Sequence, residues 1–160
     1  MPEQFIKFDG VDGESKIKPV DKWIEISNFS LSSSTPGSTS HGGGSGVGKP
    51  VMHGASFGTT AGRHSPLLNK RYFEGKHFPK VEVKYLKQTG AATPETFYHL
   101  TMEHVFITSI SNSKGEGSLG YETITLTAET YKQEYFAQDS SGKRTSVGST
   151  TYNEKTGESK

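Results

Sequence analysis

Apolar residues alternate with polar ones over five short segments of this chain, and this pattern limits its fold more than any other feature. Alternation with a period of two is typical of β-strands that bury one face, so the segments predict an antiparallel sheet. They cover residues 5–9, 22–31, 81–88, 96–109 and 123–136. In the last segment Ile124 and Leu126 share one phase, whereas Tyr131 and Tyr135 take the other. This change of phase predicts a bulge or a strong bend, as barrel strands commonly have.

One segment has the pattern of a helix. Pro66 suits a first helical position, Ser65 can cap the N-terminus, and Gly75 can end the helix in the left-handed conformation. The sequence therefore predicts a short α-helix over residues 66–74.

Residues 33–57 form a glycine- and serine-rich insert between segments with strand patterning. Such a segment has too little apolar surface to order itself, and a compact domain would normally use a short turn at this place. We therefore expect the insert to become ordered against something else. Two explanations are open: a loop that binds phosphate, or a contact arm that reaches another protein subunit.

The length of 160 residues suits one domain with a proper core. We expect residues 1–138 to form a single β-barrel domain, with the insert as its extended loop. Residues 139–160 are interpreted as a polar C-terminal tail, mobile unless it docks, in which Tyr152 is the one evident anchor.

Composition excludes several classes of function. The chain has no cysteine, which rules out disulfides, a thiolate nucleophile and cysteine-based metal sites. Its net charge is +1 and its Lys and Arg residues are scattered, which argues against nucleic-acid and membrane partners. The N-terminal segment lacks the basic start and apolar run of a signal peptide, so we expect synthesis in the cytoplasm without one.

The insert partly matches a phosphate-binding loop. Gly43, Gly48 and Lys49 satisfy its G-x-x-x-x-G-K pattern, but Pro50 stands where a Ser or Thr hydroxyl would bind magnesium. Proline also biases the preceding Lys49 away from helical geometry. The sequence therefore favours a loop that is glycine-rich for conformational reasons.

No other pattern predicts a catalytic residue, a cofactor or a metal site. The six histidines lack the spacing of metal ligands. His104, in phase with Met102 and Phe106, is interpreted as a core or interface residue, and His41, His53, His64 and His77 as loop residues. The chain has no G-x-S-x-G elbow. Most aromatic residues are interleaved with aliphatic ones at strand period, which favours core or subunit-interface packing over a platform for sugars or bases.

Short motifs run in order along almost the whole chain. They are Phe5-Ile6-Lys7-Phe8, Gly13-Glu14-Ser15, Trp23-Ile24-Glu25-Ile26, the loop from His41 to Lys49, Ser65-Pro66-Leu67-Leu68 and Gly75-Lys76-His77-Phe78. In order and spacing this series resembles the haemolysin-coregulated protein (Hcp) family, the tube proteins of type VI secretion systems. The resemblance continues through residues 100–111 and 124–135.

The resemblance implies a distorted antiparallel β-barrel of two packed sheets with one short flanking helix. It implies a structural protein rather than an enzyme: a homo-hexameric ring that stacks into a hollow tube, is secreted to the medium or a target cell, and carries effectors in its lumen. The implied partners are further copies of the chain and the sheath, spike and effector proteins of the machine.

In such proteins the long loop after the second strand reaches the adjacent ring. Ten residues of the insert are therefore the predicted ring-stacking contacts: Thr39, His41, Gly42, Gly43, Gly44, Gly46, Gly48, Lys49, Pro50 and His53. Two other functions stay open at this point: a tail-tube protein of a phage or a related contractile particle, and a ligand-binding β-barrel whose glycine loop acts as a lid.

Overall fold

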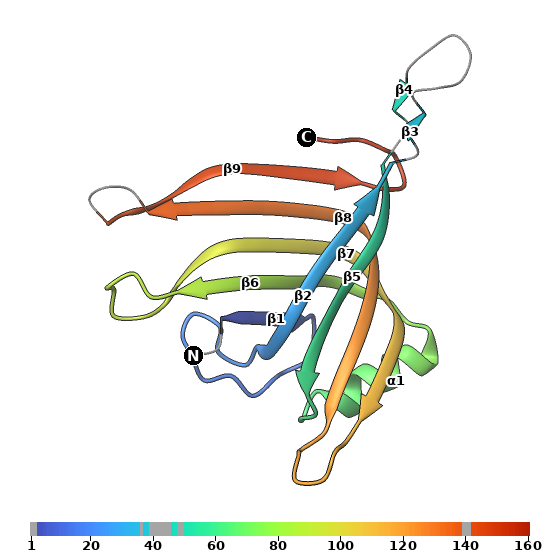
Figure 1. Ribbon diagram of the computed structural model, residues 1–160, viewed down its shortest axis with the longest axis vertical. Coiled ribbons are helices and arrows are strands. Elements are labelled where there is room, and N and C mark those ends of the chain that lie inside the picture. Colours follow the sequence, from blue (N-terminus) through green and yellow to red (C-terminus); the bar gives the residue numbers. More distant parts are fainter. Residues whose placement is uncertain (1–2, 36, 39–45, 48–49, 139–141) are drawn as a thin grey trace.

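The computed structural model of the chain describes residues 3–35, 37–38, 46–47, 50–138 and 142–160 (Figure 1). Within these residues the strands are β1 (Gln4–Phe8), β2 (Ile24–Ser34), β3 (Gly37–Ser38), β4 (Gly46–Val47), β5 (Val51–Thr60), β6 (Phe78–Lys87), β7 (Glu95–Ser113), β8 (Tyr121–Gln138) and β9 (Arg144–Asn153). The helix α1 (Ser65–Glu74) lies between β5 and β6.

The predicted antiparallel β-barrel is confirmed. Seven strands form one sheet in the order β5-β2-β1-β6-β7-β8-β9, and an additional pairing of β5 with β8 closes it into a barrel. Two parts of this continuous sheet face each other. One part contains β1, β6 and β9, the other contains β2 and β5, and the long strands β7 and β8 run through both.

The predicted bend in the last long strand is also present. Buried positions in β8 change phase between Ala128 and Tyr131. The register between β7 and β8 shifts nearby, because one extra residue of β7 lies between Ile107 and Ser109. Figure 1 shows both strands curving, so that their two halves run in different directions.

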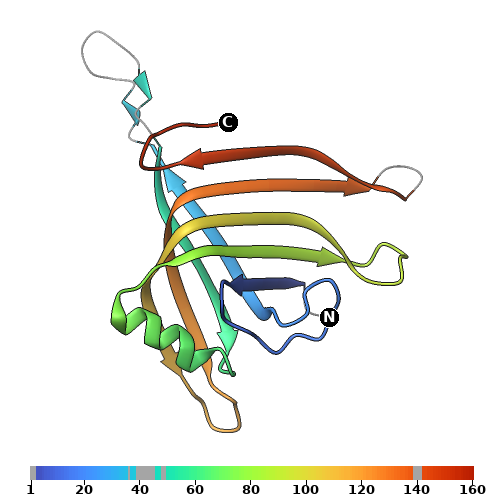
Figure 2. The ribbon, with the colours of Figure 1, turned by 180° about the vertical axis from the view of Figure 1, so that it is seen from behind.

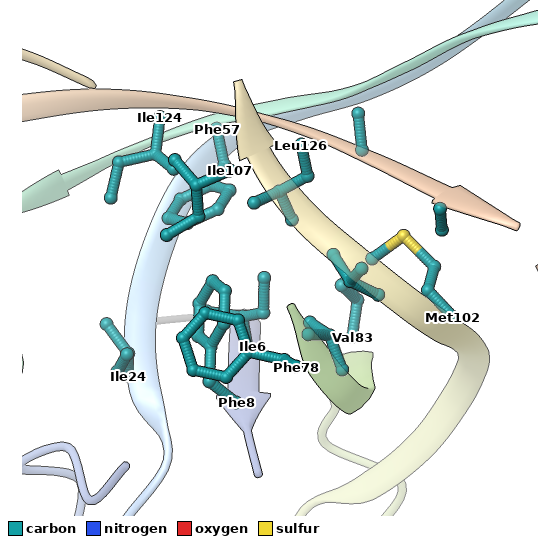
Figure 3. Packing of buried hydrophobic residues seen from close by; sticks show 14 of the residues in the cluster. Ile6, Phe8, Ile24, Phe57, Phe78, Val83, Met102, Ile107, Ile124 and Leu126 are labelled. Atoms are coloured by element: carbon teal, nitrogen blue, oxygen red, sulfur yellow. The ribbon is translucent and has the colours of Figure 1, made fainter. Parts of the chain in front are cut away.

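The main core lies between the two parts of the sheet. Phe8 of β1 packs edge-on against Phe78 of β6, with ring centroids 4.9 Å apart, and lies 6.2 Å from Phe57 of β5. Ile124 and Leu126 of β8 complete the cluster, as the close view in Figure 3 shows. Each fully buried side chain of this size contributes about 1.5–3 kcal/mol to stability. A smaller cluster of Phe5, Val20, Trp23 and Leu86 is separate from it.

Helix α1 packs against β7 and inserts Leu68 into the core (Figure 2). Gly75 ends it with φ of 67°, as predicted. The prediction for its N-terminus was wrong in one respect. His64 occupies the capping position without a side-chain bond, while Ser65 is the first helical residue and its Oγ donates to Glu122 Oε1 at 2.9 Å.

Besides the two-residue strands β3 and β4, two long strands lie where the sequence predicted irregular structure. Residues 51–57 were assigned to the insert, but they belong to β5, which pairs with β2 and β8. Residues 144–153 were assigned to the polar tail, but they form β9 along β8. The expected anchor is present, because the Tyr152 hydroxyl donates to the Pro50 carbonyl at 2.8 Å.

Candidate assembly surfaces

The β2–β5 hairpin carries the predicted ring-stacking contacts. Seven of them lie outside the described residues: Thr39, His41, Gly42, Gly43, Gly44, Gly48 and Lys49. Three are described. Gly46 pairs with Ser38 between β3 and β4, the Pro50 carbonyl accepts the Tyr152 bond, and His53 of β5 lies beside the Ser34 hydroxyl.

This hairpin extends away from the barrel. The β2–β5 ladder runs to Ser34 and Val51, and Figure 1 shows β3 and β4 beyond that end, outside the barrel wall. Near its base, Gly54 has φ of 91°, and a side chain there would collide with the Leu126 carbonyl of β8. Glycine therefore permits the close approach of β5 to β8 that holds the base of the hairpin.

A second surface is the outer edge of β9, which ends the order of strands in the sheet. Residues 158–160 cover one end of this edge. The N–H of Thr151 donates to Lys160 O and the N–H of Lys160 to Thr151 O, both at 2.8 Å, while the N–H of Asn153 donates to Glu158 O at 2.9 Å. Along residues 144–150, which are exposed, no described strand lies on this side. Such an edge offers backbone groups to another strand.

A third surface is a row of tyrosines across β6, β7 and β8, here named the aromatic row. Tyr85 is opposite Tyr98, and Tyr98 is opposite Tyr135, whose partner in β9 is Gly148. The rings of Tyr85 and Tyr98 stack with centroids 4.6 Å apart. Period two places these residues on the same face as the core residues Val83 and Leu100.

Burial decreases along the aromatic row. Tyr98 is half-buried, and this burial, with Tyr85 close by, raises its pKa to about 12. Tyr135 is 45% exposed and borders an open groove of about 430 Å³ with Tyr98, Gly148 and Thr150. The face that forms the core therefore continues past the barrel as an apolar surface that the described part of the chain leaves uncovered.

The histidines follow the sequence-based interpretation only in part. His64 and His77 lie outside the strands and the helix, as predicted, whereas His53 belongs to β5. His64 is nevertheless 3% exposed, and its Nε2 lies 3.1 Å from Oε1 of the equally buried Glu122. His104 is exposed, so it is not a core residue; it has φ of 55° and stacks on His77 with ring centroids 4.2 Å apart. No sequence signal joins His64 to a carboxylate 58 residues away.

One cross-strand ion pair has a clear electrostatic effect. His99 Nε2 lies 2.8 Å from Glu82 Oε2, and Lys80 Nζ lies 3.3 Å from Oε1. The hydrogen bond from His99, aided by Lys80 and opposed by partial burial, lowers the pKa of Glu82 to about 2.

The described residues contain neither a metal-binding cluster nor a membrane-spanning helix. Within them, no three His, Asp or Glu side chains converge as they would around a metal ion. In the same part of the chain, no helix has the length and apolar character needed to cross a membrane. The structure has three surfaces on which another protein could bind: a projecting hairpin, an open strand edge and an uncovered aromatic face.

These features define a class of protein, a small closed antiparallel β-barrel with one flanking helix and a projecting hairpin. Comparison with known families narrows the class. The model of the family described as "Type VI secretion system effector, Hcp" matches residues 5–135. The chain belongs to this Hcp family, and it is a tube-type protein of type VI secretion.

Solved structures share the fold. One, described as a type six secretion system protein, has a TM-score of 0.90 and 27% identity, with 100% of both chains covered. Hcp1 from Salmonella typhimurium has a TM-score of 0.76 and 24% identity over 99% of this chain and 98% of its own. A type VI secretion system effector from Yersinia pestis has a TM-score of 0.73 and 19% identity over 94% and 99%. No curated protein matches the chain.

Proposed function

We propose that the chain is the building block of a secreted tube. Six copies close into a ring by head-to-tail contacts, and rings stack into a hollow tube whose lumen carries effector proteins. The sheath and spike of the type VI machine act on this tube, and the chain itself performs no catalysis. The observation that carries the proposal is the family match over residues 5–135.

The lateral surfaces support ring closure. A head-to-tail ring uses two different patches of each subunit, and each patch is covered by the next copy. The open edge of β9 at residues 144–150 and the exposed end of the aromatic row at Tyr135 are next to each other, because Tyr135 pairs with Gly148. A neighbouring copy that covered both would protect an edge and bury apolar surface together.

The projecting hairpin supports stacking. It leaves the barrel along the direction of the β2–β5 ladder, so its tip can reach a second ring while the barrels remain side by side in the first. The predicted contacts Gly46, Pro50 and His53 lie on this hairpin. Because the arm is small beside the lateral surface, we expect the axial contact to be the weaker one, which lets the tube assemble and disperse.

Two measurements test the proposal. Light scattering after gel filtration of the purified chain is expected to give about 104 kDa, six times the 17.4 kDa of one chain, and negative-stain images are expected to show six-fold rings. A monodisperse monomer over a wide concentration range would contradict ring formation.

Export is tested in cells. The chain is expected in the culture medium of bacteria with an intact contractile sheath and absent from the medium when the sheath gene is deleted, with equal amounts inside both strains. Equal release from the two strains would contradict export through the type VI machine.

A further inference from the structure

A cavity of about 440 Å³ lies at the end of the β2–β5 ladder opposite the hairpin tip. We name it the acidic pocket. Glu14, Glu25, Ser27, Thr59, His64 and Tyr121 are among its lining residues. Among the described residues, the lining includes two glutamates and no Lys or Arg. The two carboxylates favour a cationic group in this pocket, and the hydroxyl groups of the lining can form hydrogen bonds with it.

The polar lining is held in place by the fold. The Thr59 hydroxyl donates to the Glu25 carbonyl at 2.8 Å, and the hydroxyls of Ser27 and Tyr121 lie 3.1 Å apart. Below them, His64 is fixed by its contact with Glu122. These groups need no rearrangement to present a polar surface.

Glu14 is positioned by the Gly13-Glu14-Ser15 segment. The N–H of Gly13 donates to Lys22 O at 2.7 Å and that of Ser15 to Trp23 O at 3.1 Å. A side chain at position 13 would lie 2.5 Å from the Trp23 carbonyl, so glycine is required for this close pairing. The Glu14 carboxylate accepts a hydrogen bond from the N–H of Arg63 at 3.3 Å, which holds it beside the pocket.

The pocket and the hairpin tip lie at opposite ends of one ladder. The pocket is lined by residues 24–27 at the start of β2 and by residues 59–61 at the end of β5. The hairpin leaves the barrel at Ser34 and Val51. The nine residue-to-residue steps from Glu25 to Ser34 span about 30 Å. Copies stacked along this direction bring the tip of one copy toward the pocket of the next.

The two ends have complementary charge. The tip segment, residues 35–50, contains Lys49 and His41 and no Asp or Glu. Glycine has no side chain to hinder the close approach of a backbone to another surface. The positive charge of the segment is therefore complementary to the two carboxylates of the pocket.

We propose that the acidic pocket receives the β2–β5 hairpin tip of a second copy in the adjacent ring, with Lys49 of that copy beside Glu25 and Glu14. This inference rests on the proposed function, because it names the receptor surface for the stacking hairpin. It names the residues that meet between two rings. Because the tip and the pocket lie at opposite ends of each copy, all rings of the stack have the same orientation.

A charge swap tests the contact. Glu25→Lys and Lys49→Glu each place like charges together, so each single variant is expected to form hexamers but to need at least about tenfold more protein to form tubes, because six weakened contacts act together between two rings. The double variant is expected to restore tube formation. Glu103→Lys is the matched control, because Glu103 is an exposed strand glutamate outside the pocket.

Cysteine cross-linking gives an independent readout, because the chain has no cysteine of its own. The Glu25→Cys, Lys49→Cys double variant is expected to form covalent chains longer than dimers on oxidation, and only under conditions that form tubes. Either single-cysteine variant can give dimers at most.

The outcomes separate the two proposals. Hexamers that stack normally in all charge variants, with no cross-linked chains, overturn the pocket contact and leave the tube function standing. Failure of the unmodified chain to form hexamers overturns the tube function itself. If Glu25→Lys stops the export of effectors while stacking is unchanged, the pocket is a cargo site and the stacking contact is overturned.

Discussion

The side chains of His64 and Glu122 are each 4% exposed, and they connect the segment before α1 to the first residues of β8. Burial of a carboxylate is costly unless its partners compensate, so removal of one partner destabilises more than the pair itself contributes. Ser65, which also donates to Glu122, supplies only part of this compensation.

We expect His64→Ala to lower the free energy of unfolding by about 3 kcal/mol, because it leaves the Glu122 carboxylate buried without its main partner. His99→Ala is the matched control, since the His99–Glu82 pair is 25% and 21% exposed and water can replace the lost bond. Urea denaturation of both variants measures the difference. Equal losses would show that burial does not set the strength of these pairs.

Glu82 predicts a pH dependence. Its pKa in the folded chain, about 2, is below the ordinary value of 4.5, so the folded state favours the ionised carboxylate. The resulting stability is present above pH 4.5 and is lost as the pH falls toward 2, by about 1 kcal/mol, because solvent screens this partly exposed pair. Unfolding experiments from pH 5 to pH 2 should show this loss. Glu82→Gln should remove that part of the slope, and an unchanged slope would contradict the assignment.

At the scale of elements, the base of the hairpin depends on one glycine. Gly54 and Gly90 have almost the same backbone angle, with φ of 91° and 88°, but only Gly54 lies against a backbone carbonyl, that of Leu126. The two positions therefore separate the strain of a left-handed side chain from a steric collision.

We expect Gly90→Ala to cost about 1 kcal/mol, the ordinary penalty of a left-handed alanine. Gly54→Ala should cost several times more, because it must also push β5 away from β8 where the barrel closes. Thermal unfolding of both variants measures this difference. If the two variants lost the same stability, the close approach at Gly54 would not contribute.

The same elements show what the sequence could predict. Five strands and the helix could be predicted because their apolar residues recur with the period of the element. Val81 and Val83 of β6, two residues apart, are an example. Strand β5 was not predicted because its first seven residues, including Gly54, were assigned to the glycine-rich insert, whereas Gly54 in fact permits close contact with Leu126. Strand β9 was not predicted because an edge strand of Thr, Ser and Gly has no apolar alternation. It forms by backbone pairing with β8, which its own sequence does not indicate.

The candidate surfaces divide in the same way. The projecting hairpin was predictable because its glycines and serines cannot order themselves. The acidic pocket was not, since Glu14, Glu25 and His64 come together only when the segment before β2 and the end of β5 meet. The aromatic row was interpreted from strand period as core or interface, and only the closure of the barrel leaves Tyr135 outside the core.

At the scale of the whole molecule, the barrel covers one part of its sheet and leaves the other part open. Strands β6 to β9 extend past the point where β5 closes the barrel on β8 (Figure 2). The aromatic row lies on this extension of β6, β7 and β8. If a neighbouring copy covers this face, a charge placed on it should prevent ring formation without unfolding the barrel.

We expect Tyr135→Asp to convert hexamers into monomers at micromolar concentration, because it buries a carboxylate without a partner in the ring contact. Lys132→Asp is the matched control, since it puts the same residue on the same strand but on the opposite face. Light scattering measures the assembly, and circular dichroism checks that both variants stay folded. Hexamers in both would show that the aromatic row lies outside the ring contact, whereas monomers in both would show that the two faces of β8 contribute alike.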